Sequence, residues 1–214
     1  MTLALASIAF AYGILRCKPV ADALQGRMPI ANLGLLVADA FLLFSACCLC
    51  LHVATAYGVR RRYLPWIVGG GAAAAIVMYS AYAVSPARGV PVHFVAHMGG
   101  TTAIYVMVAA AAMIVANVVV FVATASTLRF DDISRSDHIA LSVLLFAAAV
   151  GTGCGLQRIA YPFLDSRHIA DWYANLAWPL AASATVAYSL YAIINHFAHD
   201  DTPEGAHPQL HAGG

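Results

Sequence analysis

Long apolar runs that carry no charge are the feature that most limits what this chain can fold into. Between His97 and Thr127, for example, there is no Asp, Glu, Lys or Arg. Hydrophobic residues make up 62% of the sequence and charged residues only 10%, whereas soluble domains carry about 25% charged residues. So few charges cannot cover a water-facing surface, because much of a small domain stays exposed after folding. We therefore expect a lipid bilayer to cover the chain.

Six of these runs have the length of membrane-spanning helices. A helix needs roughly 20 mostly apolar residues, at 1.5 Å each, to cross the hydrocarbon core. The runs are too long and too evenly apolar for buried strands. They cover residues 2–16, 30–57, 64–84, 97–127, 138–158 and 172–197. The sequence thus predicts an all-α, polytopic transmembrane helix bundle in residues 1–198, followed by a disordered polar tail with His and Asp in residues 199–214.

The first run has features of a secretion signal, including the cleavage-like triplet Ala21-Asp22-Ala23. No Lys or Arg precedes it, however. We therefore expect a short spanning helix that is retained.

Basic residues suggest how the bundle is oriented. With six spans, both termini share one side, and cytoplasmic termini would place five basic residues inside (Arg60, Arg61, Arg62, Arg129 and Arg135) and six outside (Arg16, Lys18, Arg27, Arg88, Arg158 and Arg167). Basic loops tend to stay in the cytoplasm, and a tight turn of three arginines is hard to translocate. The predicted location is the cell membrane, with both termini in the cytoplasm.

Several function classes are disfavoured by charge and by missing motifs. A net charge of +1 excludes a nucleic-acid binder, which needs a basic surface to neutralise phosphates. The sequence contains no Walker loop, no G-x-S-x-G elbow and no H-E-x-x-H helix. These observations favour a protein without catalysis of its own.

Asp39 is the only carboxylate inside a predicted span. Ionisable groups at membrane depth are costly and are functional candidates by default. Asp39 could exchange a proton in a transport cycle, or it could be a structural acid that is hydrogen-bonded to Asn117 or Asn175. Arg158 begins a polar loop that could form a substrate entrance, or merely a set of surface ion pairs. These four residues make up the predicted polar track.

Histidines could hold a cofactor. Two layers of histidines are typical of a haem b bundle, and the ligands of haem b or copper would be His52, His97, His138 and His196. His93 and His97, one helical turn apart, could share a divalent metal ion, as could the tail with His196, His199, His207 and His211. The alternative is that these histidines are interfacial and solvated.

Cys47 and Cys50 form a C-x-x-C motif, but within an apolar helix, where thiols are inert. The odd number of cysteines, five, argues against a disulfide framework.

Small residues are arranged as in helices that pack closely in lipid. Gly69, Gly70 and Gly71 precede a run of alanines, and Gly151 and Gly155 form a small-x-x-x-small face. Such faces predict helix packing and allow for a homodimer.

Two segments, Pro29-Ile-Ala-Asn-Leu-Gly-Leu-Leu-Val and Arg60-Arg-Arg-Tyr-Leu-Pro-Trp, resemble segments of a group of actinobacterial multi-pass membrane proteins. That group is catalogued as candidate transporters or integral membrane regulators. The likeness lies in the order and character of segments over most of residues 1–197. It implies a multi-pass membrane protein and identifies no binding residues.

Three functional hypotheses follow. The first is transport or sensing of a small solute without in-chain catalysis. The second is an accessory subunit of a larger membrane complex. The third is a haem b- or copper-binding subunit that passes electrons to a partner.

Overall fold

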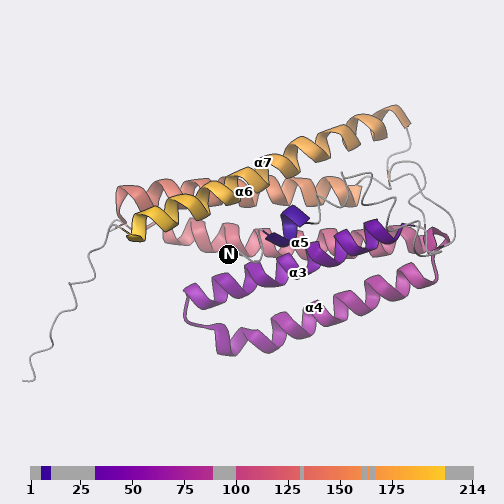
Figure 1. The fold of residues 1–214 in the computed structure, drawn as a ribbon, viewed down its shortest axis with the longest axis horizontal. Helices are drawn as coiled ribbons and strands as arrows, with labels where there is room; N and C mark the ends of the chain where they lie inside the picture. Colours follow the sequence, from indigo (N-terminus) through magenta and orange to yellow (C-terminus); the bar gives the residue numbers. More distant parts are fainter. Residues whose placement is uncertain are drawn as a thin grey trace, which may run out of the picture.

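Every regular element in the described part of the chain is a helix. The computed structural model describes residues 6–10, 32–88, 100–130, 133–160, 163 and 167–200. Residues 6–10 are helical, and the elements that follow are α3 (Leu33–Ala56), α4 (Arg60–Ala83), the 3₁₀ turn η1 (Pro86–Arg88), α5 (Gly100–Thr127), α6 (Arg135–Ala160) and α7 (Arg167–Asp200) (Figure 1). The predicted all-α bundle is confirmed.

Four of these helices, α3 to α6, are long and apolar enough to cross a membrane by length and composition. Helix α7 contains a shorter apolar stretch, Pro179–Ile194. These features suggest a membrane-spanning protein. Of the first predicted span only residues 6–10 fall within the described residues, and most of the predicted tail, residues 201–214, lies outside them.

Helix α7 begins at Arg167, five residues before its apolar run, and α4 and α6 also begin earlier than the apolar runs alone predict. Helix α6 starts at Arg135 because Ser134 caps it: the Asp137 amide donates to Ser134 Oγ at 3.1 Å, and that hydroxyl donates to Asp137 Oδ2 at 2.7 Å. Helix α4 starts at Arg60, directly after the turn that Gly58 allows with φ of 68°. Long arginine side chains at a helix end can reach out to the polar interface, so charged residues extend α4 and α6.

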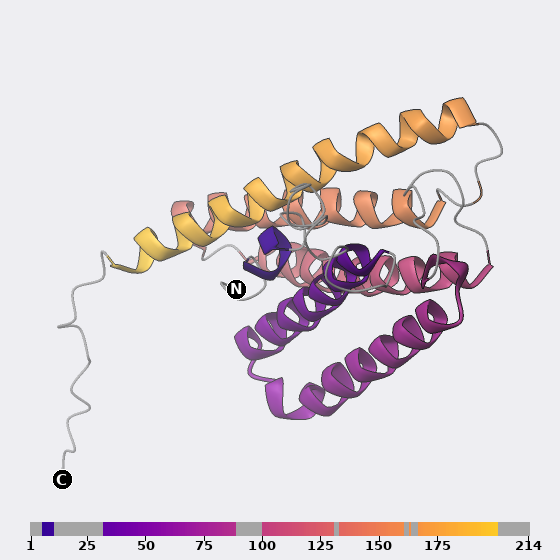
Figure 2. The ribbon, with the colours of Figure 1, turned by 45° about the vertical axis from the view of Figure 1, so that its right-hand side comes forward.

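Consecutive helices run in opposite directions, and α5 lies at the centre. Helix α5 packs against α3, α4 and α6, and α7 packs against α6. In both ribbon views α4 and α7 lie at opposite edges of the bundle (Figures 1 and 2). The start of α3 and the end of α6 therefore lie at the same end of the molecule.

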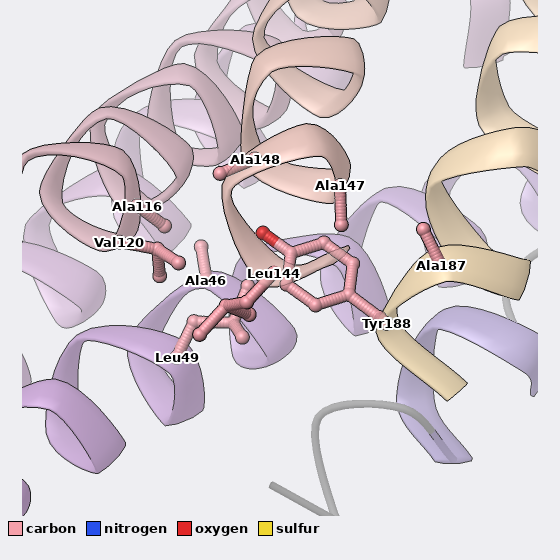
Figure 3. Close-up of a cluster of buried hydrophobic side chains, with 9 residues drawn as sticks. All are labelled: Ala46, Leu49, Ala116, Val120, Leu144, Ala147, Ala148, Ala187 and Tyr188. Atoms are coloured by element: carbon pink, nitrogen blue, oxygen red, sulfur yellow. The ribbon is translucent and has the colours of Figure 1, made fainter. Parts of the chain in front are cut away.

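The main core cluster is built largely from alanine. Four helices contribute to it: Ala46 and Leu49 from α3, Ala116 and Val120 from α5, Leu144, Ala147 and Ala148 from α6, and Ala187 and Tyr188 from α7 (Figure 3). Small side chains let helix backbones approach closely, which is how helices associate in lipid. Tyr188 is the largest member and fills the space that the alanines leave.

The predicted small-residue faces are packed in part. A Cβ atom at Gly151 would lie 2.6 Å from Asn117 Oδ1, and one at Gly155 would lie 2.5 Å from Ile114 Cγ1, so both glycines face α5 closely. Gly71 faces Cys47 of α3 in the same way, at 2.6 Å from Sγ. Gly69 and Gly70 instead face open space.

Candidate functional site

Asp39 lies on the buried face of α3, a helix that contains no other Asp, Glu, Lys or Arg. It shares that face with Leu42, Leu43 and Ala46, at the three- and four-residue spacing of one helical stripe. Its side chain is fully buried, at 0% exposure. The helix that packs the core thus also carries a carboxylate into it.

Arg158, in the last turn of α6, is the partner of Asp39. Its Nη2 atom donates a hydrogen bond to Asp39 Oδ1 within a salt bridge. The two residues are 119 positions apart, and the antiparallel order of the helices brings them to the same end of the bundle. The Asp39 carboxylate therefore pairs with a guanidinium, and neither Asn117 nor Asn175 takes that place.

The second carboxylate oxygen of Asp39, Oδ2, differs from Oδ1 in its hydrogen bonding. Among the described residues, Oδ2 has no hydrogen-bond partner. A buried acceptor without a partner costs roughly 1–3 kcal/mol, and native structures contain few such atoms. Oδ2 is thus the atom of this pair that can still accept a proton or a hydrogen bond.

A second polar group, centred on Asn117, lies deeper in the bundle. The Tyr188 hydroxyl of α7 donates to Asn117 Oδ1 at 2.6 Å, and Asn117 Nδ2 donates to the Met113 carbonyl at 2.8 Å. Asn117 is fully buried, and Gly151 of α6 leaves the room for its amide. Because Gly151 precedes Arg158 by seven residues on α6, the two groups are separated by about 10 Å along the helix axis.

A cavity of about 50 Å³ joins the two polar groups. Arg158, Asn117 and Tyr188 all line it, together with Thr185, Cys154 and apolar residues such as Ile8 and Leu42. By this measure a water molecule needs about 10–15 Å³. The cavity can therefore hold about four water molecules, or a solute of a few heavy atoms.

Three residues of the predicted polar track meet in this region, and one does not. Asp39, Arg158 and Asn117 are connected through the ion pair and the cavity. Asn175 is exposed on α7. Tyr188 is a site residue that the sequence reasoning missed. Its only signal was its position in an apolar, alanine-rich helix, where a tyrosine hydroxyl needs a partner.

The predicted haem or metal ligands are described only in part. His52 is half-buried in α3, and His138 is exposed in the first turn of α6. His93 and His97 lie outside the described residues, as do the side chains of His196 and His199. Within the described residues, no three His, Cys, Asp or Glu side chains form a group that could hold a metal ion. An absorption spectrum and metal analysis of purified protein would test these ligand predictions.

Four cysteines lie in the described part of the chain. They are Cys47, Cys48, Cys50 and Cys154, all partly buried. Cys154 alone among them lines the cavity.

Comparison of the chain with protein-family models, with curated proteins and with solved structures finds no match. The resemblance to actinobacterial multi-pass proteins remains a prediction from the sequence.

Proposed function

We propose that this protein binds and moves, or senses, a small solute through the polar centre of its helix bundle. The observation that carries the proposal is the Asp39–Arg158 ion pair beside a cavity in an otherwise apolar bundle. Charged groups within spanning helices are expensive and typically mark a solute or ion pathway. A structural pair alone would not require a cavity next to it.

Polar side chains outside the Asp39–Arg158 pair line the cavity. The cavity links Arg158, near one end of α6, to Asn117 and Tyr188 near the middle of the bundle. A small solute that crosses the bundle loses part of its hydration shell. Polar side chains at successive positions along the path can replace those lost hydrogen bonds. The small volume favours solutes of a few heavy atoms.

An experiment with proteoliposomes tests this function. The purified protein is reconstituted with a pH-sensitive dye inside, and inward gradients of K⁺, chloride, nitrate, glycerol and glycine are imposed in turn. We expect at least one gradient to drive a pH change that needs the protein and that Asp39→Asn abolishes. Asp137→Asn, a change at the opposite end of α6, is the control and should behave as the unmodified protein. Equal traces for all three proteins with every solute would refute the proposal.

Helix α4 supports a second candidate, an accessory subunit or a homodimer. This helix is mostly exposed, with Trp66, Ile76 and Tyr79 at 77%, 67% and 65% exposure, and Gly69 and Gly70 leave its backbone open. Such a face suits either lipid or a partner helix. Co-purification in mild detergent, compared between the unmodified chain and Gly70→Leu, tests for a partner. A partner that is retained equally by both would rule out this face.

We also propose that the α3–α4 turn faces the cytoplasm. Tyr57 donates to the Ala123 carbonyl at 2.8 Å, which places this turn beside the end of α5. The arginines at the start of α4 and those of the α5–α6 connection therefore lie at one end of the bundle. The numbers of basic residues at the two ends are nearly equal, but the compact turn of three arginines is hard to translocate and favours the cytoplasmic side.

A further inference from the structure

The cavity presents only one of the two paired charges. Arg158 is among the residues that line it, and Asp39 is not. The Asp39 side chain is fully buried, whereas the Arg158 side chain is 15% exposed. The charged surface that a solute in the cavity meets is therefore positive.

The neutral groups around the cavity suit the same kind of solute. Asn117 and Tyr188 are already hydrogen-bonded to each other, and the Thr185 hydroxyl donates to the Ala181 carbonyl. These groups can orient a solute without adding charge. A guanidinium presents up to five N–H donors, and Nη2 is the atom of Arg158 that donates to Asp39. Planar or spherical anions match such donors well.

We propose that the cavity binds one small inorganic anion at Arg158 and that Asp39 takes up one proton when the anion binds. This inference rests on the proposed function and names its substrate class. The charges balance: a paired carboxylate and guanidinium, plus H⁺ and the anion, become a neutral carboxylic acid and a guanidinium paired with the anion. The proton goes to Oδ2, the oxygen of Asp39 that has no hydrogen-bond partner among the described residues.

Anion binding at Arg158 and protonation of Asp39 favour each other for an electrostatic reason. An anion beside Arg158 competes with Asp39 for the same positive charge, so it favours the neutral form of the acid. Protonation of Asp39 in turn frees part of the field of Arg158 for the anion. Linkage requires that each ligand raise the affinity for the other by the same factor.

The other described titratable side chains near this pair are phenols and a thiol, which as free groups ionise only above physiological pH. They are Tyr105 of α5, Tyr82 of α4 in edge contact with Tyr105, and Cys154 and Tyr188 on the cavity wall. The next described carboxylate on α6, Asp137, precedes Arg158 by 21 residues, which is about 30 Å along the helix. Asp39 is therefore the group that exchanges the proton.

Proton uptake on anion binding is the decisive measurement. Nitrate and chloride are the probes, because their conjugate acids are fully ionised and cannot carry protons through lipid. Purified protein in weakly buffered detergent solution is titrated with each anion by calorimetry in two buffers of different ionisation enthalpy. We expect about one proton bound per anion, which the difference between the buffers reports.

Variants separate the two roles. Asp39→Asn should still bind nitrate but with no proton uptake, and its affinity should no longer depend on pH. Arg158→Gln should weaken nitrate binding by at least tenfold, and Arg158→Lys should restore part of it because the charge remains. Asp137→Asn should match the unmodified protein. Circular dichroism and gel filtration confirm that each variant is folded.

The outcomes distinguish this inference from the proposed function. If nitrate and chloride bind without proton uptake or do not bind at all, and K⁺ or glycine drives an Asp39-dependent pH change in proteoliposomes, the anion inference is wrong and the proposed function stands. If no solute gives an Asp39-dependent response, both are wrong.

Discussion

The Tyr188 hydroxyl donates a 2.6 Å hydrogen bond to Asn117 Oδ1 and so joins α7 to α5 at the middle of the bundle. Gly151 of α6 lies beside the same amide. Three helices thus meet at one polar contact, and several changes test its importance.

Tyr188→Phe should destabilise the bundle by about 1 kcal/mol. Interhelical hydrogen bonds in membrane proteins contribute roughly 0.6 kcal/mol on average, and the buried Asn117 oxygen would lose its partner. Reversible unfolding in mixed detergent micelles measures the change, and a double-mutant cycle with Asn117→Ala isolates the pair. Tyr79→Phe, at an exposed tyrosine of α4, is the control. A Tyr188→Phe protein as stable as that control would contradict the assigned role.

Gly151→Ala and Gly153→Ala should have different effects on the free energy of unfolding. A Cβ atom at Gly151 would lie 2.6 Å from Asn117 Oδ1, whereas one at Gly153 meets nothing within 4 Å. Overpacking costs about 1–3 kcal/mol, and replacing glycine by alanine in a helix gains up to about 1 kcal/mol. We expect Gly151→Ala to lower the free energy of unfolding and Gly153→Ala to leave it unchanged or raise it. Equal effects in the same unfolding assay would argue against the close α5–α6 contact.

Gly71→Ala should be milder than Gly151→Ala. Its new methyl group would meet Cys47 Sγ at 2.6 Å, and a cysteine side chain can rotate away, whereas Asn117 is held by two hydrogen bonds. Gly70→Ala, which faces open space, serves as the matched control. Chemical denaturation of the three proteins side by side gives the order, and a cost for Gly71→Ala above that of Gly151→Ala would reverse the interpretation.

Removal of one member of the Asp39–Arg158 pair should be far more harmful than removal of both. A buried charge that loses its partner costs about 3–5 kcal/mol, whereas replacing a whole pair by apolar residues is often neutral. We expect Arg158→Met to destabilise strongly and the double change Asp39→Leu with Arg158→Met to recover much of that loss. Arg88→Gln, at an exposed arginine, should have little effect. Additive losses in the double variant would show that the two side chains are not coupled.

Cysteine labelling tests the proposed orientation. In intact cells, a membrane-impermeant maleimide should label Pro86→Cys, in η1, and should label Arg61→Cys only after permeabilisation. Both positions are exposed, and the parent chain gives the background from its own thiols. The reverse pattern would invert the orientation.

The fold class could be predicted from the sequence because apolar length alone determines it. Helices α3 to α6 each fall close to a predicted run, and their ends differ by a few residues where Ser134 and the arginines extend the helix. Apolar runs indicate which part of a helix lies in lipid. They do not show how far a capping residue or arginines extend the helix beyond that part.

The site could be predicted only in part, because the face of a helix that points inward depends on how it packs. Asn175 and Tyr188 are 13 residues apart on α7, which at 100° per residue leaves their directions about 140° apart. When Tyr188 is buried, Asn175 must therefore point outward. To predict the pairing of Asp39 with Arg158, one must also know how the helices are arranged, because that arrangement brings the start of α3 close to the end of α6.

The two ends of α3 are secured to different neighbours. Near its start Asp39 is bound to α6, and just beyond its end Tyr57 is bound to the backbone and to Thr127 of α5. Between these two polar contacts, Ala46 and Leu49 pack α3 into the apolar core. Loss of the Arg158 contact would therefore remove the polar contact near the start of α3 and leave both its core packing and the Tyr57 contact in place.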